Sequence, residues 1–288
     1  MKASPGDKFR RALTQEQPLQ IVGTVNAYIA LMAKQIGYRA VYLSGAAVAN
    51  SAFGLPDLAV TTLENVLEEA RRITVRVDLP LLVDIDTGWG NALMIARTIK
   101  SLSHSGVAAV HMEDQEFNKR CGHRPGKRIV GIPEMVDRIK AAADANQDNL
   151  VLMARTDAFA NEGLDKCIER GIAYRNAGAE MLFPEALQTL EEYKQFKEAV
   201  GVPVLANLTE FGKTPQFTLK ELSQANIDMA LYPLSVNRAM NLAAEKMLKE
   251  IRTHGTQKAV LDQMQTRQEL YTYLDYYNLE KKLSSEGE

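Results

Sequence analysis

Short apolar runs alternate with longer amphipathic stretches along most of the chain. Eight of these runs are rich in Val, Leu and Ile, and they are short and continuous enough to be strands buried on both faces of a parallel sheet. They cover residues 21–25, 40–43, 79–84, 108–112, 150–154, 180–183, 202–207 and 228–232.

Helical periodicity fills most of the gaps between these runs. It covers residues 27–36, 62–74, 92–105, 133–146, 164–177, 187–200 and 219–225. Strand–helix alternation repeated eight times is the sequence form of an α/β fold, the (β/α)8 or TIM barrel. An open doubly wound sheet is the competing interpretation, and the pattern favours the barrel.

Beyond the last run, residues 237–253 and 258–283 predict two further helices. No linker rich in Pro, Gly or Ser divides the chain, so we expect one barrel domain over residues 1–288 with a C-terminal helical extension at about 239–288. The last helix is dense in tyrosine, at positions 271, 273, 276 and 277. Packing on the same barrel and a subunit interface are both open explanations for these tyrosines.

Composition narrows the classes of protein. The 288 residues include 34 Lys+Arg and 36 Asp+Glu, and this near-neutral balance argues against a nucleic-acid or polybasic membrane binder. Two cysteines do not form a disulfide framework, and no run of 18 apolar residues predicts a transmembrane helix. Residues 1–17 lack the apolar core of a secretion signal, so we expect a cytoplasmic protein.

Acidic side chains gather where the predicted strands end, which is the active-site face of a barrel. Asp84 and Asp86 are two residues apart on one strand, so both should point to the same side. Two close carboxylates repel each other unless a cation or a proton lies between them, and oxygen ligands suit Mg²⁺. The sequence therefore predicts a metal site here, with Glu113 from the next strand helping through water and Mn²⁺ as a possible substitute.

A cationic loop follows the fourth run, with the sequence KRCGHRPGKR at residues 119–128. Positive neighbours favour the thiolate form of a cysteine, and Gly and Pro indicate a loop. This pattern predicts a lid that carries Cys121 to a bound substrate as an acid or base. A solvated basic loop with an incidental cysteine is the alternative. Cys167, within a predicted helix, is expected to be structural, and His111 to be packed in the core.

Arginine and amide side chains complete the candidate pocket. Arg155, Arg238 and possibly Arg267 offer forked donors for carboxylates, and Asn207 and Thr209 offer neutral hydrogen bonds. Together with Mg²⁺, they describe a site for a small polyanionic acid. For any one arginine alone, a structural ion pair is the simpler explanation.

At this point a family resemblance can be named. The segment KRCGH resembles the K-(K/R)-C-G-H signature of the isocitrate lyase superfamily. The segments YLSG, GLPD, LLVDID, HMEDQ, MARTDA, AGAEMLFPEA, LANLTEFG and GTQKAVLDQMQTR make the chain similar, over nearly its whole length, to the methylisocitrate lyase branch of the isocitrate lyase and phosphoenolpyruvate mutase superfamily.

The resemblance implies a (β/α)8 barrel in a homotetramer, with the last helix exchanged between subunits. It implies Mg²⁺ and cleavage of a small tricarboxylate, (2S,3R)-2-methylisocitrate, to pyruvate and succinate in the 2-methylcitrate cycle of propionate catabolism. Asp84 and Asp86 would hold the metal, with Asp57 and Glu113 nearby or acting through water. The implied substrate-binding residues are Ser44, Gly45, Ala46, Gly122, Arg155, Glu185, Asn207, Leu208, Thr209, Arg238 and Arg267.

The resemblance also implies a retro-aldol mechanism. Cys121 would protonate the succinate carbanion, Glu185 would share a proton with the substrate, and Tyr42 is our candidate base for the hydroxyl proton. Phe183 and Leu231 would leave an apolar niche for the 2-methyl group, or simply pack in the core. Many members of this family have Ser-Gly-Gly where this chain has Ser44, Gly45 and Ala46. The extra methyl group of Ala46 would change the wall of the pocket and so bears on substrate preference.

Two alternatives remain open from the sequence. One is a related enzyme of the same superfamily that acts on isocitrate, oxaloacetate or a phosphonate, although the Cys-Gly-His loop argues against the phosphonate branch. The other is a non-catalytic barrel that only binds a ligand.

Overall fold

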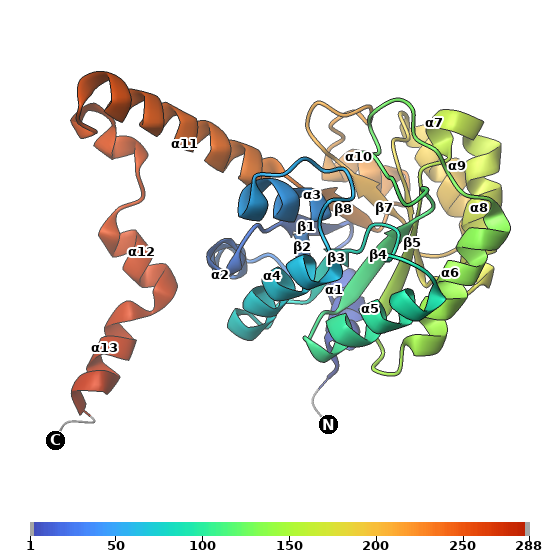
Figure 1. Ribbon diagram of the computed structural model, residues 1–288, viewed down its shortest axis with the longest axis horizontal. Coiled ribbons are helices and arrows are strands. Elements are labelled where there is room, and N and C mark those ends of the chain that lie inside the picture. The colour runs from blue at the N-terminus through green and yellow to red at the C-terminus, as the bar shows by residue number, and fades with distance from the viewer. Residues whose placement is uncertain (1–2, 286–288) are drawn as a thin grey trace.

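Eight parallel strands form the interior of the protein, and helices surround them (Figure 1). The computed structural model describes residues 3–285. The strands are β1 (Leu19–Gly23), β2 (Ala40–Leu43), β3 (Leu81–Asp84), β4 (Ala109–Glu113), β5 (Val151–Thr156), β6 (Met181–Pro184), β7 (Leu205–Asn207) and β8 (Met229–Tyr232). Every strand overlaps one of the predicted apolar runs.

The strand order shows that the sheet is a barrel. Consecutive strands from β1 to β6 pair in parallel, β7 pairs with β8, and β8 pairs with β1. Between β6 and β7 the ring is closed by a parallel bridge from Leu182 to Val204. This confirms the TIM-like barrel and rules out the open doubly wound sheet.

The helices cover the outside of this barrel. They are α2 (Ala27–Ile36), α4 (Leu63–Arg76), α5 (Ala92–His104), α6 (Ile132–Ala145), α8 (Leu164–Asn176), α9 (Leu190–Val200) and α10 (Leu219–Gln224), with short turns at α3 (Gly45–Ala47), the π-helix η1 (Val48–Ala52) and α7 (Phe159–Glu162). Helix α4 begins where expected, because Thr62 and Asn65 form a reciprocal capping box.

Helix α1 (Pro5–Gln15), which the apolar pattern did not predict, closes the N-terminal end of the barrel. Its Phe9 is fully buried in the same cluster as Leu82 and Leu231 from the barrel interior. The signal for this helix was present in the sequence, since Ser4 and Asp7 form a capping box around Pro5.

Alternation along β3 decides which side chains reach the interior. Leu81 and Val83 belong to the layer between strands and helices, whereas Leu82 belongs to the interior cluster. By the same period of two, Asp84 faces inward at the end of the strand. The fold therefore aims the first predicted metal ligand into the mouth of the barrel.

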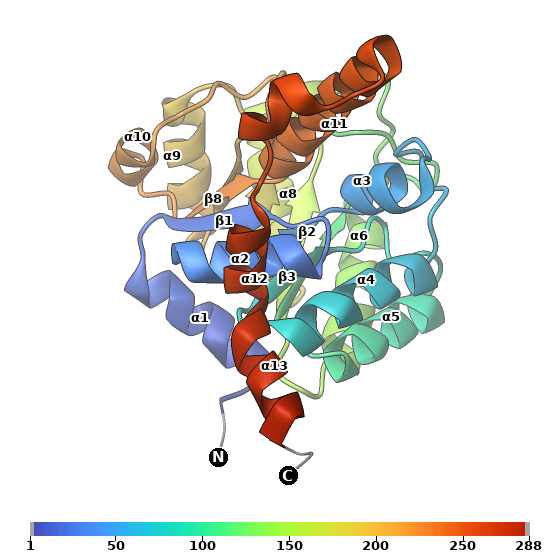
Figure 2. The same cartoon turned by 90° about the vertical axis from the view of Figure 1, so that its left-hand side faces the viewer.

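The C-terminal arm, residues 235–285, leaves the barrel and returns along its side (Figures 1 and 2). It contains α11 (Ser235–His254), a 3-10 turn η2 (Lys258–Gln263), α12 (Arg267–Leu274) and α13 (Tyr276–Ser285). The prediction of one helix over residues 258–283 is wrong. Thr266 caps a new helix, and Asp275, with a left-handed φ of 57°, ends it.

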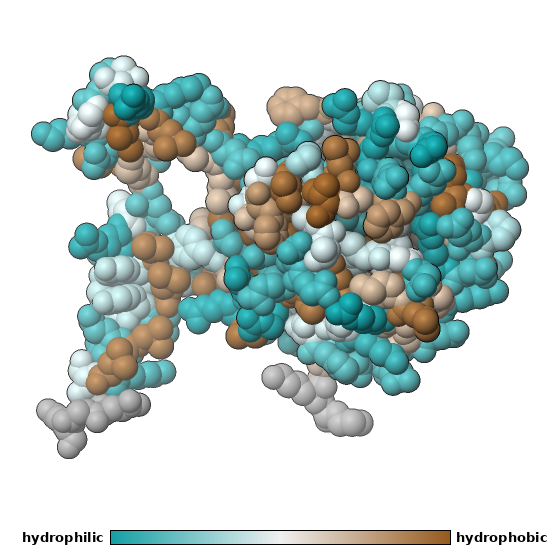
Figure 3. All heavy atoms as spheres, viewed as in Figure 1, coloured by the Kyte–Doolittle hydropathy of each residue, from teal (hydrophilic) through white to brown (hydrophobic). Residues whose placement is uncertain are grey.

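The arm contacts the barrel at α2. The Tyr28 hydroxyl donates to Gln265 Oε1 at 2.6 Å, and the rings of Tyr28 and Tyr273 meet edge to face. Along α11, Leu248 is 70% exposed, and apolar side chains are visible along the arm (Figure 3). Exchange of the last helix between subunits stays a prediction. In the part of the chain described, no helix is long and apolar enough to cross a membrane.

Candidate functional site

Side chains from the ends of several strands meet in a small cavity of about 60 Å³ at the C-terminal mouth of the barrel. The cavity lies beneath the cationic loop, residues 119–128, which is part of the connection between β4 and α6. Its lining residues are Tyr42, Ser44, Ala46, Asp57, Asp84, Lys119, Arg120, Cys121, Gly122, His123, Arg155, Phe183, Glu185, Asn207, Thr209, Leu231, Pro233 and Leu234. The structure thus brings most of the predicted site residues into one place.

The paired aspartates converge, but not by strand alternation. Strand β3 ends at Asp84, and Asp86 has a left-handed φ of 47°, an uncommon conformation for a residue with a side chain. Its backbone N–H donates to Asp84 Oδ1 at 3.0 Å. A side-chain carbon placed on Gly45 would lie 3.3 Å from both Asp84 Oδ2 and Asp86 Oδ1. Gly45 therefore leaves open space beside both carboxylates.

Lys119 lies among these acidic groups. Its Nζ is 2.5 Å from Asp57 Oδ1 and 2.7 Å from Asp86 Oδ1, and its side chain is buried. Burial raises the pKa of Asp86 to about 6, even though Lys119 favours its charged form. Burial alone would lower the pKa of Lys119, but the surrounding carboxylates, Asp86 foremost, raise it. A positive charge already balances this cluster.

The donor set fits a hard divalent cation. Asp84, Asp86 and Asp57 offer carboxylate oxygens, and Glu113 Oε1 is buried without a hydrogen-bond partner among the residues described. No group of three or more His, Cys, Asp or Glu side chains within the described residues encloses a metal position. The arrangement suits two direct aspartate ligands with the remaining oxygens acting through water, as Mg²⁺ prefers.

Arg155, at the end of β5, is the second charged centre of the site. It donates to Asp157 Oδ2 from Nε at 2.9 Å and lies 3.3 Å from Glu113 and 3.1 Å from Glu185. Burial would lower the pKa of Arg155, but the neighbouring carboxylates, Asp157 foremost, raise it. The guanidinium is therefore a fixed, charged donor beside the cavity.

Glu185, at the end of β6, is held by His123 and Asn207. The Lys213 backbone N–H donates to His123 Nδ1 at 2.9 Å, so His123 carries its proton on Nε2, which is 2.9 Å from Glu185 Oε1. Asn207 Nδ2 donates to the same oxygen at 3.2 Å. Burial opposes the charged form, yet Arg155 and His123 hold the pKa of Glu185 below its usual range.

The tip of the cationic loop enters the mouth of the barrel. A side-chain carbon on Gly122 would lie 2.4 Å from Arg155 Nη2 and 2.5 Å from Glu185 Cγ, so only glycine fits this approach. The adjacent Cys121 lines the same cavity as Asp84, while its residue as a whole is exposed. The thiol and the predicted metal ligands therefore share one end of the barrel.

Comparison with known proteins now places this geometry in a family. A family model described as phosphoenolpyruvate phosphomutase matches residues 9–252. A 2-methylisocitrate lyase from Vibrio cholerae serotype O1 is 58% identical over 98% of this chain and 94% of its own. The chain belongs to the 2-methylisocitrate lyase family.

Solved structures of the wider superfamily share the barrel. A 2,3-dimethylmalate lyase, a member of the PEP mutase/isocitrate lyase superfamily, has a TM-score of 0.91 and 31% identity, covering 100% of this chain and 97% of its own. A phosphonopyruvate hydrolase in complex with oxalate and Mg²⁺ has a TM-score of 0.85 and 26% identity, covering 97% of this chain and 98% of its own.

Beneath the site of this 2-methylisocitrate lyase family member, Tyr42 and His111 form a buried pair. The Tyr42 hydroxyl is 2.9 Å from His111 Nε2, and His111 also packs edge to face against Phe183. Burial lowers the pKa of His111 to about 4, so the imidazole is neutral, and burial raises the pKa of Tyr42. His111 is packed in the core, as the sequence predicted.

Four predicted substrate residues do not line the cavity of their own chain. Gly45 contributes its backbone N–H to Asp84 Oδ2 at 3.2 Å, and the side chain of Leu208 lies in the outer core. The side chain of Arg238 is 43% exposed and 3.3 Å from Glu210. Arg267 is exposed at the start of α12 on the C-terminal arm. Their roles in the family remain predictions.

Sequence reasoning gave no individual role to several residues of the site. Lys119 and His123 were seen only as part of the cationic loop, and the sequence signal was their place beside Cys121. Asp157 follows Arg155 by two residues, a spacing that could have identified it as the arginine's partner. Pro233 and Leu234 gave no signal, because they look like ordinary loop residues after β8.

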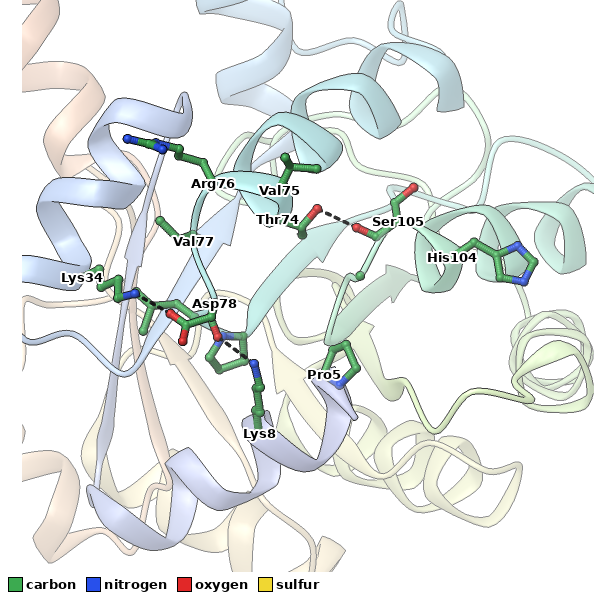
Figure 4. Close-up of a pocket in the computed structure, with 13 residues that line it drawn as sticks. Pro5, Lys8, Lys34, Thr74, Val75, Arg76, Val77, Asp78, His104 and Ser105 are labelled. Carbon is green, nitrogen blue, oxygen red and sulfur yellow. Dashed lines mark hydrogen bonds and ion pairs between the residues drawn. The ribbon is translucent and has the colours of Figure 1, made fainter. Parts of the chain in front are cut away.

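A larger hollow of about 500 Å³ lies at the opposite, N-terminal end of the barrel (Figure 4). Its charged groups are already satisfied at the surface. Lys34 pairs with Asp78 at 2.7 Å, and Lys8 donates to the Asp78 carbonyl at 3.3 Å. Among the described residues that line this hollow, the one carboxylate is Asp78, whose side chain is 69% exposed.

Proposed function

We propose that the protein is a Mg²⁺-dependent carbon–carbon lyase that cleaves (2S,3R)-2-methylisocitrate to pyruvate and succinate, a step of the 2-methylcitrate cycle in propionate catabolism. One observation carries the proposal. Asp84, the buried Arg155 and the loop cysteine Cys121 line one cavity at the barrel mouth of a 2-methylisocitrate lyase family member, and Asp86 donates its backbone N–H to Asp84 beside that cavity.

Asp84 and Asp86 would hold the metal, with Asp57 and Glu113 acting through water. A bound Mg²⁺, or Mn²⁺, would supply Lewis-acid stabilisation of the negative charge on the C2 oxygen of the pyruvate half once the hydroxyl proton has left. Lys119 would have to leave its place between Asp57 and Asp86 for this cation to bind.

The chain's own donors orient the substrate carboxylates. Arg155 is held by the carboxylates of Asp157, Glu113 and Glu185 and lines the cavity. Asn207 and Thr209 add neutral hydrogen-bonding groups to the same lining. Ser44 and Ala46 line the cavity just after β2, and the backbone N–H of Gly45 between them donates to Asp84 Oδ2. The contacts of Gly122, Leu208, Arg238 and Arg267 belong to the same proposal.

The proton transfers balance within the site. The C2 hydroxyl gives up its proton, the C2–C3 bond breaks, and its electron pair stays on the succinate carbon, which takes a proton from Cys121. Tyr42 is the candidate base. Because its phenol is protonated, it must pass on its own proton as it accepts one, and His111 Nε2 lies 2.9 Å away to receive it. This proton must then return to the Cys121 thiolate before the next turnover.

The 2-methyl group would occupy an apolar corner of the cavity. Phe183 and Leu231 lie on its wall beside Pro233 and Leu234, so a methyl group gains burial there that a hydrogen does not. This corner favours 2-methylisocitrate over isocitrate.

The proposal includes the assembly and its location. We expect a single-domain homotetramer with exchanged C-terminal helices, supported by the exposed Leu248 and Ile251 on α11 and by Arg267, which is distant from its own cavity. We expect a cytoplasmic protein, consistent with Cys121 and Cys167 both being free thiols.

Product release from purified protein tests the proposal directly. With Mg²⁺, 2-methylisocitrate should yield equal amounts of pyruvate and succinate, and kcat/KM should exceed that for isocitrate by at least about tenfold, the typical worth of one buried methyl. Isocitrate is followed by succinate release and oxaloacetate by oxalate release. Preference for either would identify a related enzyme instead, and tight binding without turnover would identify a non-catalytic barrel.

A further inference from the structure

The positively charged side chains of the cationic loop point in two directions. Lys119 and Lys127 point inward and are buried, whereas Arg120, Arg124 and Arg128 are exposed. Each buried lysine ends on a carboxylate at the mouth of the barrel. Lys119 lies on the proposed metal ligands, but Lys127 lies on the other side of the site, on a residue that the proposed chemistry does not use.

The Lys127 partner is Asp157. Lys127 Nζ donates to Asp157 Oδ1 at 2.8 Å, and the two side chains are 1% and 0% exposed. The same carboxylate accepts from Arg155 Nε and Nη2 at 2.9 and 3.1 Å. One carboxylate therefore joins the loop to the arginine that orients the substrate.

Other residues also fix the position of Asp157. Its backbone N–H donates to Asp114 Oδ1 at 2.8 Å, and Tyr174 donates to the other Asp114 oxygen at 2.8 Å. Asn161 Nδ2 donates to the Lys127 carbonyl at 3.0 Å. Lys127 thus docks onto a preassembled and rigid partner.

We propose that Lys127 is a positioning residue that fastens the cationic loop over the cavity through Asp157, and thereby fixes the orientation of Arg155 while Cys121 is in place. When the loop opens, the buried carboxylate of Asp157 loses one of its two cationic partners and keeps only Arg155, so opening the loop is opposed as long as the pair with Lys127 is intact. The kinetic part of this inference rests on the proposed function, whereas the structural part does not.

Hydrogen exchange of the ligand-free protein tests the fastening. Lys127→Met should speed exchange of the amides of residues 116–130 by about tenfold or more, while the amides of β1 to β5 keep their rates. Arg128→Met is the matched control, since it removes one positive charge from the next residue, whose side chain is 72% exposed. Exchange in this control should stay within about twofold of the wild type.

Turnover tests the link to Arg155 and Cys121. Lys127→Met should lower kcat by about tenfold or more and leave KM within about threefold, because substrate enters before the loop closes. Lys127→Arg, which can still reach the carboxylate as a cation, should restore most of the turnover. Lys127→Gln gives the same comparison if the methionine variant does not fold.

The outcomes separate the two ideas. Equal loop exchange in Lys127→Met and Arg128→Met would overturn the fastening role, whatever the substrate is. Faster exchange across the whole barrel would also overturn it, because Lys127 would then support the fold rather than the loop. A wild type with no activity on 2-methylisocitrate, but with loop exchange that depends on Lys127, would reject the proposed function and keep the fastening.

Discussion

The two ends of the barrel differ in what they bury. The C-terminal mouth encloses a cavity of about 60 Å³, and three of its charged residues, Asp84, Arg155 and Glu185, are almost entirely removed from water. The N-terminal end has a hollow of about 500 Å³, larger than this cavity, but its Lys34 and Asp78 side chains are 47% and 69% exposed. Buried charge, not the size of a hollow, distinguishes the functional end.

The chain direction explains this difference. All strands run the same way, so the loops after them bring their polar residues to one end, while the opposite end receives helix ends and short turns. At that opposite end, α1 places Phe9 against the barrel interior and completes the apolar core. The same topology therefore places the polar residues of the candidate site at the mouth and apolar packing at the N-terminal end, which we call the base of the barrel.

Removal of divalent cations should have the largest effect on turnover, because the proposed metal site lies at the mouth of the barrel. After exhaustive chelation, turnover of 2-methylisocitrate should fall to background, and Mg²⁺ or Mn²⁺ should restore it, because the cation that Asp84 and Asp86 would hold supplies the Lewis acid of the proposed reaction. Full activity after chelation would show that the reaction needs no divalent cation at Asp84 and Asp86.

A pair of matched amide variants locates the metal. Asp86→Asn should weaken Mn²⁺ affinity, measured by electron paramagnetic resonance, by more than the roughly 10–100-fold that loss of an outer-shell group costs. Asp78→Asn, the same change at the base, should leave Mn²⁺ affinity unaltered. If Asp86→Asn and Asp78→Asn weakened Mn²⁺ affinity equally, the metal could not be assigned to the mouth of the barrel.

Loss of the loop thiol should have the next largest effect. Cys121→Ser should lower kcat by about 10²–10⁴-fold, the usual contribution of a general acid, while calorimetry still detects substrate binding. Cys121 is exposed, so the melting temperature should not change. Cys167→Ala is the control, because this buried cysteine lies in α8 and does not line the cavity. Wild-type turnover in Cys121→Ser would exclude the thiol from the mechanism.

Much of this arrangement could be predicted from the sequence, because it follows from chain direction. Continuous apolar runs identified the strands, and the polar residues at their ends, such as Asp84, Arg155 and Glu185, came to one end of the barrel. Strand–helix alternation was enough to predict the barrel, since parallel strands need a crossover between them.

The rest depended on contacts between distant segments. Asp86 meets Asp84 through a left-handed turn that strand alternation does not describe. The pairing of Lys127 with Asp157 joins residues 30 positions apart, so local patterns did not indicate it. The break at Asp275 was missed because its neighbours all favour helix, and only its backbone conformation ends α12.

The smallest effect is expected at the base, and it completes the comparison. Lys34→Met removes the ion pair with Asp78 in the larger hollow, just as Lys127→Met removes a lysine–aspartate pair at the mouth. Because the base pair is exposed, water replaces the lost partner, and the free energy of unfolding should change by less than about 1 kcal/mol. Turnover should stay within about twofold of the wild type, since surface changes rarely reach a distant site. Denaturant unfolding and steady-state kinetics of the two variants, measured together, check this. A tenfold loss of turnover from Lys34→Met would mean that the N-terminal end of the barrel affects the reaction at the mouth. An exposed ion pair could then not be assumed to be unimportant for function.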